Sequence, residues 1–240
     1  MLNRNHRILV LSDVHGNSEA LKNVLDHEIQ FGFDFIIGLG DYVGYYPYAN
    51  EVINLLKVYP GVFISGNHDI GVVKKSITNR DLDYRWRTTE RELTLENRVW
   101  LANLQEELEV ESIFGKCVFS HASHLAPDGY LYPDTHINVT SGSRSVYFVG
   151  HTHIQMARRV GNSIFVNPGS IGQPRNGRPG SDYAILENGI VTFHHLAYDV
   201  DSVAQDIKDW SSSASIELLL RSDPARFSRN PCELQEFSLY

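Results

Sequence analysis

The sequence predicts an α/β fold. Short apolar, β-branched or aromatic runs recur along the 240 residues, and they have the length of buried strands. Stretches in which apolar residues recur at helical spacing separate several of these runs in the first half of the chain. From Gln155 onward, strand-like runs are joined by short turn signals instead. We therefore expect an alternating β/α first half that leads into an antiparallel, hairpin-rich second half.

Six apolar runs define the expected strands, at residues 8–11, 35–37, 62–64, 117–119, 146–149 and 164–166. For runs this short, periodicity alone leaves a buried helix open. A helix is expected between the capping-type Ser18 and Gly32, because apolar residues recur between them at helical spacing. A shorter helix is expected around residues 52–56, where Pro60 and Gly61 follow as a stop.

Two turn signals organise the second half of the chain. Gly161-Asn162 and Asn188-Gly189 each join two strand-like runs, and the second pair is a strong signal for a type I′ hairpin. Between the two halves, the polar stretch at residues 80–109 carries spaced leucines and a tryptophan, which predicts one or two longer helices.

Length and repeats indicate how many domains to expect. Residues 1–201 are expected to form one domain, because the chain shows neither an internal repeat nor a clear linker. Residues 202–240 are expected to form a peripheral C-terminal helix and tail, with the helix at residues 216–220. We expect the last dozen residues to be disordered.

Composition and charge limit the ligand and the compartment. With 42% hydrophobic and 21% charged residues, the chain has the composition of a soluble globular protein. A formal charge of −8 with scattered basic residues argues against a long nucleic acid as the principal ligand. Cys117 and Cys232 are too few for a disulfide framework, which suggests a reducing compartment. We find no signal-peptide core or membrane span, so we expect a cytoplasmic protein without membrane contact.

Metal-binding side chains follow five of the expected strands, usually beside a glycine or another small residue. These residues are Asp13, His15, Asp41, Asn67, His121, His151 and His153. Strands of an α/β sheet tend to bring such ends to a common edge, where ligands bind. A lone Asp-x-His or His-x-His is a weak signal. Five such strand ends in one chain favour a metal site over unrelated structural roles.

The ligand types indicate which metals the site would hold. Carboxylate, amide and imidazole donors suit divalent Mn, Fe, Zn or Ni better than thiol-seeking ions. Six or seven donors exceed what one tetrahedral zinc requires, so two divalent ions are the economical interpretation. One carboxylate can bridge two ions, and Asp41 is the candidate.

These residues resemble the calcineurin-like metallophosphoesterase superfamily, whose motifs run D-x-H, G-D, G-N-H-[DE], H and G-H-x-H. All five motifs occur in this order, and the resemblance covers residues 8–198. Residues 40–47 and 167–175 look like the small bacterial and archaeal phosphodiesterase-like branch. The resemblance implies a four-layer αββα sandwich with two mixed β-sheets and the metals at the edge of both sheets.

The resemblance also assigns roles. It implies that one ion is held by Asp13, His15 and His153, and the other by Asn67, His121 and His151. Asp41 would bridge the two ions, and His68 would donate a proton or orient the phosphate. The arginine that follows the G-D motif in phosphoprotein phosphatases is missing after Asp41, which argues against a protein phosphatase.

The expected reaction is hydrolysis of a small phosphate ester by attack of a metal-bridging hydroxide. A phosphodiester, with a nucleotide-derived one as an option, is preferred over a phosphomonoester. A non-catalytic scaffold of the same fold is the alternative from another class, and the intact Asn67-His68-Asp69 argues against it. Asn17 and Arg175 are candidate substrate contacts, although Asn17 also suits a helix cap and Arg175 an ordinary surface position.

Three further questions are open at this stage. Asp69 either orients the imidazole of His68 or has a structural role. The tyrosines after Asp41 either stack a nucleobase or, as we favour, pack the loop; they are Tyr42, Tyr45, Tyr46 and Tyr48. The sequence gives no indication of the oligomeric state.

Overall fold

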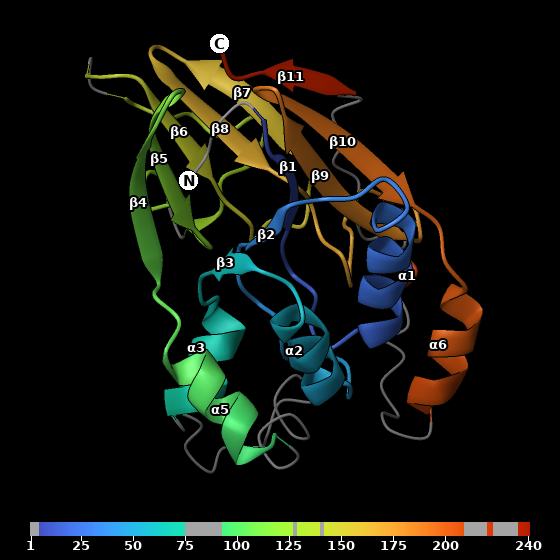
Figure 1. Ribbon diagram of the computed structural model, residues 1–240. Helices are drawn as coiled ribbons and strands as arrows, with labels where there is room; N and C mark the ends of the chain where they lie inside the picture. Colours follow the sequence, from blue (N-terminus) through green and yellow to red (C-terminus); the bar gives the residue numbers. More distant parts are fainter. Residues whose placement is uncertain (1–4, 75–92, 127–128, 140–141, 209–219, 223–234) are drawn as a thin grey trace.

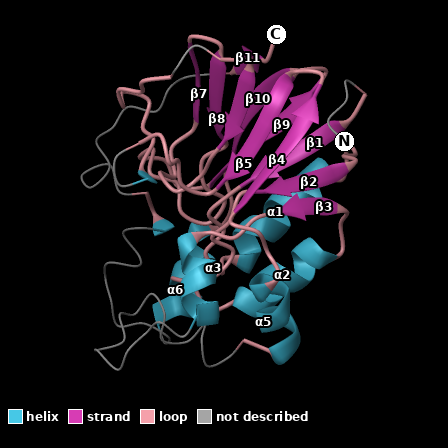
Figure 2. Cartoon of the chain, turned by 90° about the vertical axis from the view of Figure 1, so that its left-hand side faces the viewer, coloured by secondary structure: helices cyan, strands magenta, loops and turns pink. Residues whose placement is uncertain are grey.

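Two β-sheets packed face to face form the centre of the protein, and the described helices gather on one side of them (Figures 1 and 2). The computed structural model describes residues 5–74, 93–126, 129–139, 142–208, 220–222 and 235–240. No helix among these residues is both long enough and apolar enough to span a bilayer. The α/β class is confirmed.

The first sheet has six strands in the order β11-β10-β9-β1-β2-β3. Their bounds are β1 Arg7–Leu11, β2 Phe35–Gly38, β3 Gly61–Phe63, β9 Ser181–Glu187, β10 Ile190–Leu196 and β11 Glu236–Ser238. β1, β2 and β3 run parallel, whereas β9 pairs antiparallel with both β1 and β10. The sheet is therefore mixed, as expected.

The second sheet has five strands in the order β4-β5-β6-β8-β7. Their bounds are β4 Glu107–Ser112, β5 Gly115–Ser120, β6 Ser145–Phe148, β7 Met156–Val160 and β8 Ser163–Asn167. The three central strands are parallel, and the two edge strands pair antiparallel with them. The prediction of two mixed sheets is confirmed.

Four helices, α1 Ser18–Glu28, α2 Ala49–Lys57, α3 Asn67–Lys74 and α5 Leu95–Ala102, pack on the outer face of the first sheet. Another helix, α6 Val200–Lys208, packs instead on Tyr45 and Tyr46 of the loop after Asp41. α1 begins where expected, because the Asn17 side chain accepts a hydrogen bond from the backbone N–H of Ala20. Thr94 caps α5 in the same way, by accepting from the N–H of Asn97.

The side chains of β1 show why its run is apolar at every position. Leu9 and Leu11 pack with α1 and α2, whereas Ile8 and Val10 pack against the second sheet. A strand buried on both faces needs apolar side chains on both. The outer face of the second sheet is covered by the segment after β5, which packs Leu131 and other apolar residues on it. The described part of this fourth layer is mainly irregular chain.

One predicted helix is wrong over part of its length. Residues 107–109, placed in the helical stretch 80–109, belong to β4 and pair with β5. Exposed and half-buried residues alternate along β4, which is the pattern of an edge strand. α5 confirms a helix in the middle of that stretch. The predictions for residues 80–92 and 216–219 lie outside the described residues.

The end of the chain also differs from the expectation of disorder. Residues 236–238 form β11, which pairs antiparallel with β10, and Leu239 is fully buried between the sheets. The domain boundary expected at residue 201 falls within α6. The division of the chain into a domain and a peripheral segment stays a prediction.

Candidate metal centre

Five loops meet at one end of the sandwich, where β1, β2, β3, β5 and β6 each lead into an expected ligand. Backbone hydrogen bonds hold the loops together. Asp13 N–H donates to the carbonyl of Gly40 at 3.0 Å, and Gly150 N–H donates to that of His121 at 2.9 Å. The predicted convergence of these strand ends is present in the fold.

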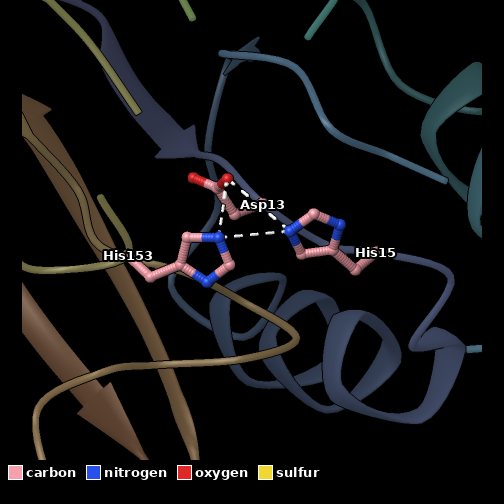
Figure 3. Close-up of side chains that lie close together, drawn as sticks. All are labelled: Asp13, His15 and His153. Atoms are coloured by element: carbon pink, nitrogen blue, oxygen red, sulfur yellow. Dashed lines mark hydrogen bonds and ion pairs between the residues drawn. The ribbon is translucent and has the colours of Figure 1, made fainter. Parts of the chain in front are cut away.

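The first cluster consists of Asp13, His15 and His153, whose side chains point toward one another (Figure 3). His153 Nε2 lies 3.2 Å from Asp13 Oδ1 and 3.2 Å from His15 Nε2. Asp13 Oδ1 is buried and accepts no hydrogen bond from the described residues. A buried carboxylate oxygen without a donor, facing two imidazole nitrogens, fits a cation between them.

The second cluster consists of Asp41, His121 and His151. His121 Nε2 lies 3.2 Å from Asp41 Oδ2, and His151 Nδ1 lies 3.2 Å from His121 Nε2. The two clusters adjoin, because Asp41 Oδ2 is also 3.8 Å from His15 Nε2. Asp41 therefore stands between the clusters, where a bridging ligand would have to be.

Backbone carbonyls orient the imidazole rings. His121 Nδ1 lies 2.7 Å from the carbonyl oxygen of Leu39, and His153 Nδ1 lies 2.7 Å from that of Gln173. A carbonyl only accepts, so each Nδ1 donates its proton there, and each Nε2 faces the cluster. Nε2 is therefore the nitrogen of these rings that would bind a metal.

Left-handed backbone is concentrated at the expected ligands. Five of the seven have positive φ, at 54° for Asp13, 54° for His15, 57° for Asp41, 68° for His151 and 60° for His153. Non-glycine residues rarely adopt this conformation, which costs about 1–3 kcal/mol each, and such residues gather at functional sites. The turns aim each side chain back across the strand ends.

The two carboxylates are held ionised. Burial alone would raise the pKa of Asp41, but His121 and His68 lower it well below its ordinary value. Burial would likewise raise the pKa of Asp13, but His153 and His121 lower it. Two buried anions among imidazoles make a site that favours cations.

His68 and Asn67 open α3 beside the second cluster. The backbone N–H of His68 donates to Asp41 Oδ1 at 2.8 Å. The ring centroid of His68 lies 4.7 Å from that of His15. His68 is also within ligand reach of His15 and Asp41, so the geometry admits either a proton donor or a ligand. Asn67 is exposed and lines a cavity of about 480 Å³ together with His121.

Asp69 has a structural role, which settles one open question. Its carboxylate accepts hydrogen bonds from the backbone N–H groups of Asp41 at 2.8 Å, Tyr42 at 3.0 Å and Gly66 at 2.9 Å. These bonds tie the loop that carries Asp41 to the start of α3. Asp69 therefore positions Asp41 and does not orient the imidazole of His68.

Asn17 and Arg175 lie near the centre in different ways. Asn17 is fully buried, and in addition to capping α1 it donates to Gly172 O at 3.2 Å and to the Tyr198 hydroxyl at 2.9 Å. Arg175 is half-buried, and its backbone N–H donates to the carbonyl of His153 at 3.0 Å. A substrate contact by either residue stays a prediction.

Three of the four tyrosines after Asp41 are buried, which supports the packing role favoured for them. Tyr42 and Tyr46 are fully buried, and Tyr45 packs edge-on against the ring of His15, whereas Tyr48 is half-buried. Sequence reasoning missed Tyr130, whose ring centroid lies 4.0 Å from that of His151. Tyr130 carries no motif and follows no strand, so no sequence signal indicated it.

A two-sheet α/β sandwich that gathers His and Asp donors from both sheets at one end is the architecture of a metal-dependent hydrolase. The sequence model of the calcineurin-like phosphoesterase superfamily domain matches residues 7–189. The chain belongs to this superfamily, and the protein is a metal-dependent phosphoesterase.

The chain is also similar to two curated proteins and to a solved structure. An uncharacterized protein of Methanocaldococcus jannaschii is 34% identical over 75% of this chain and 82% of its own length. The phosphodiesterase YfcE of Escherichia coli K12 is 25% identical over 78% of this chain and 90% of its own. A metallophosphoesterase from Sphaerobacter thermophilus superposes with a TM-score of 0.73 at 25% identity, covering 91% of this chain and 99% of that one.

Proposed function

We propose that the protein hydrolyses a small phosphodiester with two divalent metal ions, one at each cluster. The main support is the position of Asp41, whose Oδ2 lies 3.8 Å from His15 Nε2 and 3.2 Å from His121 Nε2, close enough to share an ion with either histidine. Similarity to a phosphodiesterase and the missing arginine after Asp41 favour a diester over a monoester. Mn, Fe, Zn and Ni all suit the donor set.

The residues would divide the work as follows. Asp13, His15 and His153 would hold one ion, Asn67, His121 and His151 the other, and Asp41 both. When bound, the two ions would neutralise phosphate charge and activate the attacking water. His68 would donate a proton to the leaving oxygen, and Arg175 would hold a phosphate oxygen through its guanidinium fork.

The test begins with protein stripped by a chelator and reloaded with each metal separately. We expect near two ions per chain, and hydrolysis of bis(p-nitrophenyl) phosphate that exceeds hydrolysis of p-nitrophenyl phosphate. Metal binding with faster monoester hydrolysis would replace the diester proposal by a phosphomonoesterase. Full metal content without turnover of either substrate would favour a scaffold.

Asp41→Asn tests the bridging role. The amide of asparagine keeps the shape of the side chain but loses the negative charge and one of the two oxygens that can bind a metal. We expect the metal content to fall and turnover to drop to the background rate. Unchanged metal content with full activity would contradict the bridging role.

His68→Ala separates a proton donor from a ligand. We expect both metals to remain while kcat falls by about 10²–10⁴, the usual contribution of general acid catalysis. A substrate with a good leaving group, such as p-nitrophenol, needs less protonation and should lose less activity. If His68→Ala instead loses metal, then His68 is a ligand.

A further inference from the structure

The expected ligands are not equally accessible, and this shows where a substrate enters. Asp13 and His15 are 0% exposed, His153 and Asp41 2%, and His121 4%. His151 is half-buried and Asn67 is exposed. The centre is therefore open on the side of the second cluster.

Two tyrosines stand on that open side. The ring of Tyr130 lies on His151, with centroids 4.0 Å apart and planes tilted by 35°. Tyr132 stacks with Tyr130, at a centroid distance of 5.9 Å and an interplanar angle of 11°. Both are half-buried, whereas Tyr45, which packs on His15 and His68, is only 7% exposed.

The loop that carries this pair is held in place. Leu131, between the two tyrosines, is 1% exposed and packs into the core cluster beneath the loop. The Tyr132 N–H donates to Thr135 Oγ1 at 2.9 Å. Arg158 donates to the carbonyls of Pro133 at 2.6 Å and Thr135 at 2.9 Å. The rings are thus presented without a large ordering cost on binding.

A cationic group lies beside the same centre. The backbone N–H of Arg175 donates to the carbonyl of His153 at 3.0 Å, and the ring of Tyr130 lies on His151, so both residues adjoin expected ligands of the second sheet. Arg175 and the metal ligands would attract phosphate, while flat tyrosine rings attract another flat ring. A charged residue and aromatic surface therefore flank the same metal centre.

We propose that Tyr130 and Tyr132 form a subsite for the organic group of the substrate, and that this group carries a flat aromatic ring such as a nucleobase. This inference rests on the proposed function and names the substrate class of that same site. Each base–aromatic stack strengthens binding by about 5- to 150-fold, because every base offers a π-face.

The test measures binding of two monoesters to the metal-loaded protein by calorimetry, which does not depend on turnover. Phenyl phosphate and methyl phosphate share the phosphate and differ in the ring. We expect wild type to prefer phenyl phosphate by about 5- to 150-fold. Thymidine 5′-monophosphate, which carries a flat base, should likewise bind more tightly than methyl phosphate. Tyr130→Leu and Tyr132→Leu should each reduce the preference, whereas Tyr130→Phe should keep it.

The controls distinguish a failure of the proposed subsite from a failure of the proposed function. Metal content is measured for every variant, because Tyr130 touches an expected ligand. Tyr59→Leu removes a half-buried tyrosine that packs on Phe33, away from the centre, and should leave the preference unchanged. Equal binding of both monoesters by wild type, or an undiminished preference in Tyr132→Leu with full metal content, would overturn the subsite. Binding of neither monoester by the metal-loaded protein would also overturn the subsite, whereas failure to bind metal would overturn the proposed function itself.

Discussion

At the scale of single residues, the candidate ligands could be proposed from the sequence, but their surroundings could not. Asp13 and His151 could be found because each follows an apolar run beside a small residue. The role of Asp69 depends on backbone N–H groups of Asp41 and Tyr42, which only the folded chain brings to it. The left-handed backbone of the ligands also leaves no trace in the sequence.

Gly44 shows how closely the loop after Asp41 fits the candidate acid. A Cβ atom at Gly44 would lie 2.3 Å from His68 Nδ1, and φ is +96°. We expect Gly44→Ala to displace the imidazole and to lower kcat by about 10² or more, with the metal content kept. Steady-state kinetics and metal analysis would measure both effects.

The matched control for Gly44→Ala is Gly32→Ala. Gly32 has φ of +74°, but apart from its two chain neighbours no atom of the described residues lies within 4 Å of its Cβ position. The substitution carries the backbone strain without the clash, so activity should stay. In a His68→Ala background, Gly44→Ala should add little; an additive loss would show that Gly44 acts on something other than His68.

At the scale of elements, the strands buried on both faces were the most predictable, since their apolar runs are continuous. β4 was missed because Leu108 continues the helical spacing of Leu101 and Leu104, although glutamates alternate with Leu108 and Val110 in the sequence; the pairing with β5 decides for a strand. β11 was missed because three residues carry too little pattern, and its pairing with β10 is a tertiary effect. The hairpin signal at Asn188-Gly189 is confirmed.

The β9–β10 turn gives a test at this scale. Asn188 has φ of 52° and Gly189 has φ of 76°, the left-handed pair that a type I′ turn requires. Asn188→Val should lower the free energy of unfolding by about 1–2 kcal/mol, because a β-branched side chain is strained there. Asn188→Gly should change it by only a few tenths. Urea denaturation would measure both, and equal effects would contradict a left-handed turn.

At the scale of the whole molecule, the centre joins the two sheets. Asp13 and Asp41 follow strands of the first sheet, whereas His121, His151 and His153 follow strands of the second. Ions held by both sets would connect the sheets at one end, while Leu239 and its neighbours fill the interface elsewhere. The loops that carry the expected ligands have strained backbone and hold two buried carboxylates. Cations bound there should therefore stabilise the folded state.

Metal binding should therefore stabilise the fold as well as enable turnover. A ligand at 100 times its Kd stabilises the folded state by about 2.7 kcal/mol, which is about 5–11 °C in Tm for a chain of this size. We expect calorimetry to show this increase when Mn²⁺ is added to chelator-treated protein, and a smaller one in Asp41→Asn. Because the increase comes from cations shared between the sheets, it should also appear in His68→Ala if that residue is only a proton donor. A Tm that an excess of metal leaves unchanged would mean that the clusters do not hold ions tightly enough to connect the sheets.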